Sequence, residues 1–334
     1  MTAIDRALGT LHGLALGDAL GMPTQSFSRA QVLSRFGHVT TLLDAPADQP
    51  VAPGMHSGST TDDTAQALLI AQLLIEGSGH INPDHLAQRL IAWELKMKAK
   101  GSKDLLGPST KHAIERIQAG HTPDDSGRHG TTNGAAMRIA PVGIAINITQ
   151  AERFLDTVIQ ACQVTHNTSL GIASAAAIAA VVSSGINGET LEHALNAGTK
   201  MAFMAEPHGH WVAGGRIGPR IRWARKESLK CSTGNIGDWL YDVIGTSVAS
   251  QESVVAAFAL AQQVASGKLG SFDALCMAAS LGGDTDTIAA MLGAMLGACG
   301  TMPNWPVALV NHVIQVNALH LEPLALSLLT LRNT

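Results

Sequence analysis

Apolar residues recur at intervals of three and four along most of the chain, which is the spacing of one face of an α-helix. The run 149–164 opens with T-Q-A-E, a capping-box pattern, and Asn82 with Pro83 marks another helix start. Further starts are predicted where a serine precedes an apolar run, at Ser250 (252–265) and Ser271 (272–280). Alternating runs typical of strands are scarce, and only 140–148 is ambiguous. The pattern predicts an all-α protein.

Two of the predicted helices carry a face of small residues at four-residue spacing. The members are Gly9, Gly13, Gly17 and Gly21 near one end of the chain and Ala289, Gly293 and Gly297 near the other. Such spacing lets two helix backbones approach closely. We hypothesise that both faces lie in the core, with contact between the two as one arrangement.

Polar segments rich in glycine and proline interrupt the helical pattern at 44–58, 101–110, 119–134 and 205–220. Most are too short to be true linkers. The chain shows no long repeat, low-complexity tract or shift in composition. We therefore expect one compact many-helix domain over residues 1–334.

Composition and charge bear on whether the protein binds nucleic acid or a membrane, and on its cellular compartment. The formal net charge is −4 and Lys and Arg are scattered, so the sequence favours no nucleic acid partner. The most apolar runs, 171–182 and 288–299, are shorter than the about 20 residues of a membrane span. The four cysteines show no paired spacing and the N-terminal stretch has no signal pattern. These features predict a cytoplasmic protein without a membrane partner.

Two nearly charge-free helices are predicted to begin with acidic residues, at T-D-D-T (61–64) and at G-G-D-T-D-T (282–287). Capping alone explains either stretch by itself, because free N–H groups and the helix dipole favour carboxylates. Capping needs one acidic residue rather than four in total, so the pair of starts favours a shared site. Carboxylates and hydroxyls without cysteine suit Mg²⁺, Mn²⁺ or Ca²⁺ and disfavour zinc. Two closely spaced ions could be held in this way.

A third stretch, G-T-T-N-G-A-A-M-R at 130–138, combines two glycines with an asparagine amide. It is either an ordinary tight turn or a loop whose backbone approaches a sugar or phosphate. His166 precedes the apolar run 170–182. A histidine in this position is either a satisfied helix-start residue or a functional one.

Five motifs in this order resemble the ADP-ribosylglycohydrolase family, which includes the dinitrogen-reductase-activating glycohydrolase. They are G-D-A-L-G (17–21), T-D-D-T (61–64), N-G-A-A-M-R (133–138), T-H (165–166) and G-G-D-T-D-T (282–287). The resemblance spans roughly residues 5–300. It implies an all-α fold with two Mg²⁺ or Mn²⁺ ions in a central cleft. It also implies hydrolysis of the bond between C1'' of ADP-ribose and a nitrogen or oxygen of a small-molecule or protein acceptor.

The resemblance further implies a role for each matching position. Metal ligands would come from one side as Thr61, Asp62 and Asp63, and from the other as Asp284, Asp286 and Thr287. Substrate contacts would come from Asn133, Gly134 and His166, and from two less specific loops that contain Gly107 and Gly245. Asp62 and Asp63, with a metal-activated water, and Gln25 would form the catalytic group.

The chain departs from the family pattern at Gln25, where family members commonly carry glutamate after G-D-A-L-G. An amide can hydrogen-bond ribose but cannot carry a proton at neutral pH. Either Asp62 or Asp63 with a metal-bound hydroxide does the acid–base work, with Asp104 as a substitute base, or activity is altered or lost. The alternative function is therefore a protein that binds ADP-ribose or a nucleotide without cleaving it.

A second departure concerns adenine. Some family members place aromatic rings near the glycine loop, whereas His129, Thr131 and Thr132 stand there in this chain. Stacking on a base is worth about 1–3 kcal/mol, so its loss weakens the preference for the full ligand. His129 could stack instead, and a smaller riboside or another N- or O-glycoside is the alternative substrate.

Overall fold

A computed structural model describes residues 2–99, 106–300 and 305–332. Helices account for its regular structure, and the described residues contain only two isolated β-bridges, Thr132 with Ala249 and Thr168 with His210. The first half holds α1 (Ala3–Gly21), η1 (Met22–Thr24), α2 (Arg29–Phe36), α3 (Asp62–Glu76), α4 (Pro83–Ala99), α5 (Pro108–Gln118), α6 (Pro123–Ser126), α7 (Gly134–Met137), α8 (Ala140–Ala145) and α9 (Ala151–His166). The second half holds α10 (Ser169–Ile186), α11 (Leu191–Ala205), α12 (Ile217–Ser228), α13 (Ile236–Trp239), η2 (Leu240–Ile244), α14 (Ser250–Ala265), α15 (Ser271–Ala279), α16 (Thr285–Cys299), α17 (Val307–Asn317) and α18 (Leu321–Arg332). The all-α prediction is confirmed.

The helix starts show where local sequence rules held. Asn82 caps α4 as predicted, because its Oδ1 accepts the N–H groups of Asp84 and His85 at 2.9 and 3.1 Å. The capping box at Thr149 is wrong, since α9 begins after Gln150 without a side-chain cap and the Thr149 N–H bonds Asn147 Oδ1 instead. An Asx turn competes there with the expected cap.

Two other predicted starts are displaced by one residue. Ser250 and Ser271 are the first residues of α14 and α15, and Ala249 and Gly270 hold the capping positions. The ambiguous run 140–148 contains the short helix α8, which is buried along its whole length. Burial on all sides explains why that run lacks a polar face.

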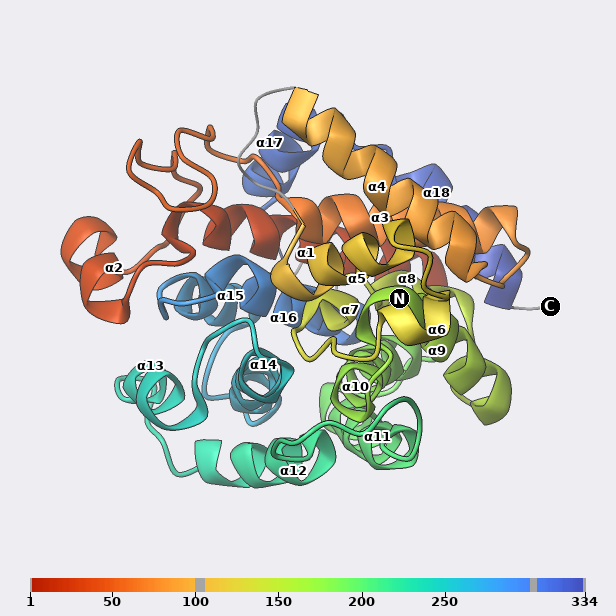
Figure 1. Ribbon diagram of the computed structural model, residues 1–334. Helices are drawn as coiled ribbons and strands as arrows, with labels where there is room; N and C mark the ends of the chain where they lie inside the picture. The colour runs from red at the N-terminus through yellow and green to blue at the C-terminus, as the bar shows by residue number, and fades with distance from the viewer. Residues whose placement is uncertain (1, 100–105, 301–304, 333–334) are drawn as a thin grey trace.

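The glycine faces of α1 and α16 lie against each other at the centre of the molecule (Figure 1). A Cβ added to Gly9 would lie 2.7 Å from the carbonyl oxygen of Gly297, and one on Gly17 would lie closer still to that of Ala289. Real Cβ atoms do not tolerate such distances, so the two backbones touch because their side chains are missing. The hypothesised mutual contact is confirmed, and it brings both ends of the chain into one core.

The remaining helices surround this central pair (Figure 1). One of them, α10, is longer than the apolar run that marks it in the sequence, and by length and mean hydropathy (1.8) it could cross a membrane. However, 94% of it is buried inside the protein, which is the environment of a core helix. The helices α17 and α18 reach a comparable apolar length only across a bend of 93°.

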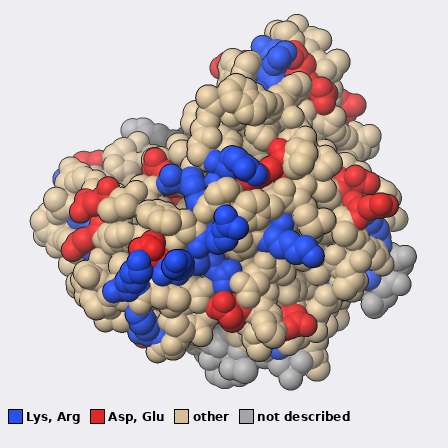
Figure 2. Space-filling view, turned by 90° about the horizontal axis from the view of Figure 1, so that it is seen from below, with Lys and Arg blue, Asp and Glu red and all other residues tan. Residues whose placement is uncertain are grey.

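Basic residues are less scattered than the sequence indicated. Figure 2 looks onto the face that carries α12, and Lys and Arg gather there. Arg222 and Lys226 are exposed residues of α12. Other cations of this region are paired with glutamates, as Arg216–Glu206, Arg225–Glu192 and Lys230–Glu227. The positive charge of this face is therefore partly compensated.

Candidate active site

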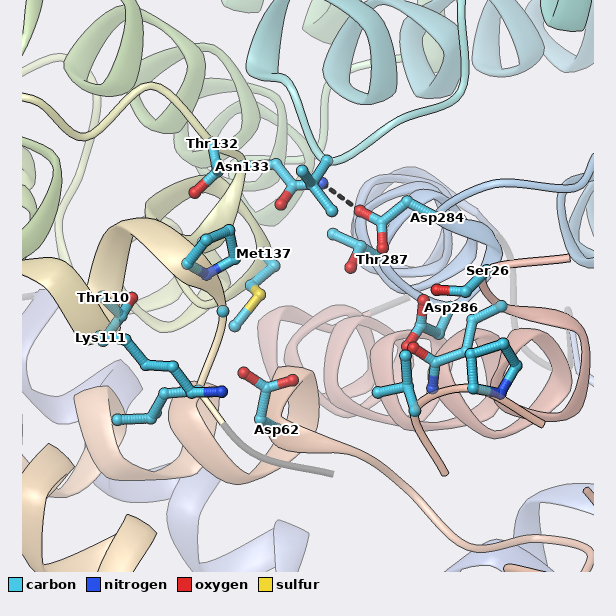
Figure 3. A pocket seen from close by; sticks show the side chains of 18 residues that line it. Ser26, Asp62, Thr110, Lys111, Thr132, Asn133, Met137, Asp284, Asp286 and Thr287 are labelled. Carbon is cyan, nitrogen blue, oxygen red and sulfur yellow. Dashed lines mark hydrogen bonds between the residues drawn. The ribbon is translucent and has the colours of Figure 1, made fainter. Parts of the chain in front are cut away.

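A cleft of about 320 Å³ opens where the starts of α3, α5 and α16 meet the loop before α7 (Figure 3). Eight residues that the sequence predicted for the site line it: Gln25, Asp62, Gly107, Asn133, Gly134, Asp284, Asp286 and Thr287. They come from segments separated by up to about 260 residues, which the contact of α1 with α16 brings together. The fold thus collects the predicted motifs in one place.

The acidic start of α3 is held by one carboxylate that the sequence reasoning did not assign. Asp18 of α1 is fully buried, and its two oxygens accept the N–H and hydroxyl groups of both Thr61 and Thr64. These distances run from 2.5 to 3.0 Å. The available signal was a single charged residue in the G-D-A-L-G motif, within a stretch that otherwise carries no Asp, Glu, Lys or Arg between Arg6 and Arg29. Asp18 fixes the T-D-D-T turn in place.

The acidic start of α16 is held mainly by backbone contacts. The Asp284 N–H donates to the carbonyl oxygen of Thr246 at 2.7 Å, and the Gly283 N–H donates to that of Phe27 at 2.8 Å. Asn133 Nδ2 donates to Asp284 Oδ2 at 2.5 Å and so ties the loop before α7 to this start (Figure 3). Gly282 and Gly283 both have positive φ, which glycine adopts without strain.

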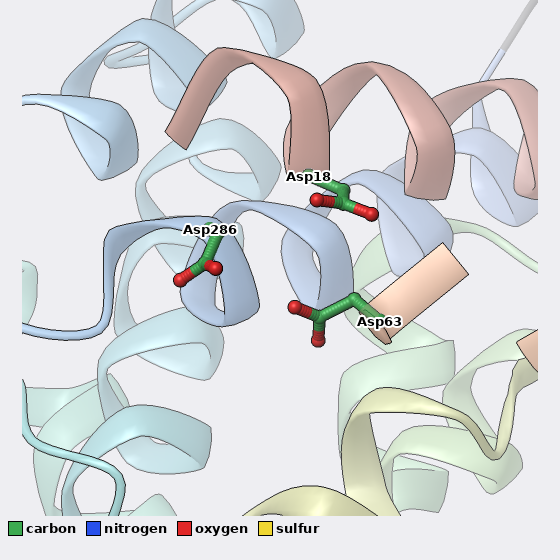
Figure 4. Close-up of side chains that lie close together, drawn as sticks. All are labelled: Asp18, Asp63 and Asp286. Atoms are coloured by element: carbon green, nitrogen blue, oxygen red, sulfur yellow. The ribbon is translucent and has the colours of Figure 1, made fainter. Parts of the chain in front are cut away.

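The two starts meet side by side. Thr287 Oγ1 donates to Asp63 Oδ2 at 3.3 Å, and oxygens of Asp18, Asp63 and Asp286 lie within 4.8 Å of one another (Figure 4). Asp18 is already saturated by hydrogen bonds, whereas Asp63 Oδ1 is buried without a hydrogen-bond partner. We therefore regard Asp18 as a support for the cluster and Asp63 as a carboxylate with an oxygen left for a ligand.

Burial and mutual repulsion make this cluster costly when it is fully ionised. Burial, followed by the charges of Asp18 and Asp284, raises the pKa of Asp62 to about 7. Burial raises the pKa of Asp18 to about 6, against the pull of its threonine donors. The pKa of Asp63 lies well above its usual range because of burial and the four neighbouring carboxylates, and burial also raises the pKa of Asp284. A cation among these oxygens would remove the repulsion.

The glycines of the loop before α7 allow it to pack tightly against α9. A Cβ on Gly134 would lie 2.9 Å from His166 Cε1, and one on Gly130 would collide with the carbonyl oxygen of Thr165. The Asn133 N–H donates to the carbonyl oxygen of Val248 at 2.9 Å. The loop is thus clamped between α9 and the segment that precedes α14.

Two predicted substrate contacts, His166 and Gly245, do not line the cleft. His166 is fully buried behind Gly134 and does not line the cleft, because the loop covers it. Gly245 packs against Glu252, and Val248 reaches the cleft instead. Thr61 and Asp63 also lie behind the lining, where they contact Asp18 and Thr287.

Gln25 follows η1 and lines the cleft while only 5% exposed. Its side-chain Nε2 is buried without a hydrogen-bond partner, and its carbonyl oxygen is held by Gln49 Nε2 at 3.1 Å. A buried amide nitrogen without a hydrogen-bond partner costs free energy, and an acceptor atom of a ligand in the cleft would remove that cost. The exposed His129 lies beside His112 at 6.1 Å between ring centroids, and Asp104 is outside the described residues.

The fold and the acidic cleft define an all-α protein with a site suited to binding a polar ligand at hard cations. The sequence model of the ADP-ribosylglycohydrolase family matches residues 1–334, and the chain belongs to this family. It is therefore a hydrolase of the ADP-ribosylglycohydrolase type.

The chain is also similar to individual proteins and to a solved structure. The chain is 34% identical to the uncharacterised protein YegU of Escherichia coli, over 97% of this chain and 96% of YegU. It is 26% identical to the ADP-ribosylarginine hydrolase Tri1 of Pseudomonas putida, over 93% and 76% of the two chains. A solved structure of an ADP-ribosylglycohydrolase-related protein complex superposes with a TM-score of 0.71 at 24% identity, covering 98% of each chain, and shows the same fold.

Proposed function

We propose that this protein hydrolyses the N- or O-glycosidic bond of an ADP-ribosyl or related ribosyl group with the help of two Mg²⁺ or Mn²⁺ ions. The observation that carries the proposal is the convergence of two acidic helix starts on one cleft, with Asp63 Oδ1 buried and without a hydrogen-bond partner. An uncompensated buried carboxylate oxygen costs free energy that a bound cation would recover.

The residues present fit hard divalent cations. Six side chains supply only oxygen ligands, from Thr61, Asp62, Asp63, Asp284, Asp286 and Thr287. Mg²⁺ and Mn²⁺ prefer carboxylate and hydroxyl oxygens. When bound, such ions orient substrate hydroxyls and lower the pKa of an attacking water.

The chain's own residues divide the remaining work. Asp62 lines the cleft and Asp63 lies behind it, so Asp62 is the carboxylate of this start that can exchange a proton with the reactants. Its Oδ2 accepts Gln66 Nε2 at 2.6 Å, which orients the carboxylate. Carboxylates beside the glycosidic carbon also stabilise the positive charge that develops there.

Gln25 binds the substrate in this proposal and does not transfer a proton. Its Nε2 donates to an oxygen of the ribosyl group or of the leaving group, because an amide cannot act as an acid at neutral pH. Asn133 and Gly134 form the wall that faces the ribose, and Gly107 lies at the start of α5 in the same cleft.

A panel of candidate substrates tests the proposal. ADP-ribosyl-arginine, O-acetyl-ADP-ribose and simple ribosides are incubated with excess Mg²⁺ or Mn²⁺, with EDTA as the control. We expect ADP-ribose to be released in an EDTA-sensitive manner. Hydrolysis of simple ribosides alone would support the proposed site and show that the substrate is a group smaller than ADP-ribosyl.

The same panel separates hydrolysis from binding without cleavage. Intact substrate after long incubation with excess protein, for every compound and metal, would contradict the proposed hydrolysis. Gln25→Glu is then measured beside the wild type, since gained turnover would identify Gln25 as the cause.

A further inference from the structure

A continuous chain of hydrogen bonds runs behind the cleft, with Arg138, the last residue of the N-G-A-A-M-R motif, in its middle. Arg138 is fully buried and donates through Nη1 to Gln66 Oε1 at 2.7 Å and through Nη2 to Thr165 Oγ1 at 2.7 Å. Thr165 Oγ1 lies 2.7 Å from His166 Nδ1, and His166 Nε2 lies 2.9 Å from Thr132 Oγ1. Both ends of this chain reach cleft residues, Asp62 through Gln66 and Thr132 directly.

The direction of each hydrogen bond follows from the guanidinium, which has donors and no acceptor. Because Arg138 donates to Gln66 Oε1, the Gln66 amide must turn its NH₂ group toward Asp62 Oδ2, where it lies at 2.6 Å. The orientation of Gln66 is thus set by a fixed charge. The same argument applies on the other side of Arg138.

The hydrogen bond from Arg138 Nη2 to Thr165 Oγ1 also fixes the direction of the next bond, between Thr165 and His166. Thr165 is fully buried, and among the described residues its hydroxyl has two partners, Arg138 and His166 Nδ1. Since the oxygen accepts from Arg138, the hydroxyl proton is satisfied only by donation to His166 Nδ1. His166 then carries its own proton on Nε2.

The last bond reaches the cleft. With the proton on Nε2, His166 donates to Thr132 Oγ1, so the Thr132 hydroxyl proton is not used by the histidine. Thr132 is partly exposed and lines the cleft (Figure 3). The hydroxyl proton of Thr132 is therefore available to an acceptor atom of a ligand bound in the cleft.

We propose that Arg138 is a positioning residue that fixes the Nε2–H tautomer of His166 and thereby makes the Thr132 hydroxyl a donor to an acceptor oxygen of the bound ligand. The choice of an ADP-ribosyl oxygen, from a ribose hydroxyl or from the diphosphate, rests on the proposed function. A cleft hydroxyl whose proton is left to the ligand favours ligands that present an oxygen acceptor at this point.

The charges around His166 agree with a neutral ring. Burial and then the charge of Arg138 lower the pKa of His166 well below its usual range. Burial lowers the pKa of Arg138 to about 10, so the guanidinium stays charged at neutral pH. In the described chain no carboxylate lies within ion-pairing distance of Arg138, and Gln66 bridges Arg138 to Asp62 by hydrogen bonds.

The tautomer is measured first, on the ligand-free protein, by two-bond ¹H–¹⁵N NMR correlation of the histidine rings. The His166 signals are assigned by their loss in His166→Gln. We expect a protonated Nε2 and an unprotonated Nδ1 that accepts a hydrogen bond. In Thr165→Val the Nδ1 atom loses its donor, and the Nδ1–H form should become populated.

Two results would overturn the tautomer assignment. One is an Nδ1–H ring in the wild type, and the other is an unchanged ring in Thr165→Val. Arg138→Met is a second variant, because it keeps a long buried side chain but removes every donor to Thr165. A tautomer unchanged in Arg138→Met and lost in Thr165→Val would assign the role to Thr165 alone and contradict the role of Arg138.

The ligand side is measured by calorimetric binding of ADP-ribose in the presence of Mg²⁺. Thr132→Val should weaken binding about tenfold, the effect of one lost hydrogen bond, whereas Thr132→Ser keeps the hydroxyl and should stay within about twofold of wild type. Equal affinity of Thr132→Val and wild type would overturn the donor role. Failure of the wild type to bind ADP-ribose would contradict an ADP-ribosyl substrate and the ligand assigned to Thr132, while the ligand-free tautomer remains an independent test of Arg138.

Discussion

The two acidic helix starts look alike in sequence, yet the protein holds them by different means. The start of α3 depends on one side chain, Asp18, which accepts hydrogen bonds from Thr61 and Thr64. The start of α16 depends on backbone contacts to Thr246 and Phe27. A side-chain support can be removed by one substitution, whereas a backbone support survives most substitutions. The first start is therefore the more vulnerable half of the site.

The largest expected effect comes from a change that separates both starts at once. Gly17→Ala places a Cβ against the Ala289 backbone, at the contact of α1 with α16 that carries both halves. Overpacking two rigid backbones should cost about 3 kcal/mol or more, and thermal melting measures it. Gly234→Ala is the matched control, because its Cβ would meet only Ser232 Oγ at 3.9 Å. Equal melting temperatures of the two variants would contradict the packing argument.

Turnover should depend equally on the two acidic helix starts, although different contacts hold them in place. Asp62→Asn and Asp284→Asn each remove one cleft carboxylate, and we expect each to lower metal-dependent turnover about 100-fold or more. Steady-state rates at saturating Mg²⁺ measure the effect. The exposed Asp156→Asn serves as the charge-matched control. Full activity in both cleft variants would show that the site is assigned wrongly.

Asp18→Asn should expose the difference between the starts. The amide keeps the shape of the carboxylate but offers only one acceptor oxygen to the donors of Thr61 and Thr64. We expect the affinity for Mg²⁺ or Mn²⁺ to fall about tenfold or more, as for other residues that support metal ligands. Isothermal titration of the metal measures this change. Unchanged affinity would mean that the α3 start holds its shape without Asp18.

The smallest effect concerns pH in the absence of metal. A carboxyl whose pKa is higher in the folded than in the unfolded chain favours folding when protonated. Asp62, raised from 3.8 to about 7, and Asp18, raised to about 6, therefore predict that stability in EDTA falls as pH rises from about 4 to about 7. We expect the melting temperature to drop by a few degrees across this window. Excess Mg²⁺ at the upper end should restore it, and a melting temperature in EDTA that rises with pH here would refute the cluster's electrostatics.

Much of the fold was predictable because local rules act alone in the relevant segments. The three- and four-residue periodicity predicted helices, and the glycine spacing predicted helix faces that allow close backbone contact, since each pattern lies within a single segment. Helix caps were less predictable. Thr149 failed because Asn147 competes for the same backbone N–H, which a pattern match does not weigh.

The candidate site was predictable where residue type decides the chemistry. Carboxylates at the starts of two otherwise nearly charge-free helices predict a shared cation site, and the cleft contains Asp62, Asp284 and Asp286. The sequence could not say that Asp63 lies behind Asp62, because adjacent residues at a helix start fan in different directions.

Only the tertiary structure decided which residues support the cleft and which reach it. Asp18 matters because four donors from a distant segment surround it, and His166 lies behind the loop because two glycines let that loop pack onto α9. The roles of Arg138 and Thr132 likewise depend on the direction of hydrogen bonds between segments. Sequence determines which chemical groups and helical faces are present. Their distances, burial and donor–acceptor roles arise only when distant segments are packed together.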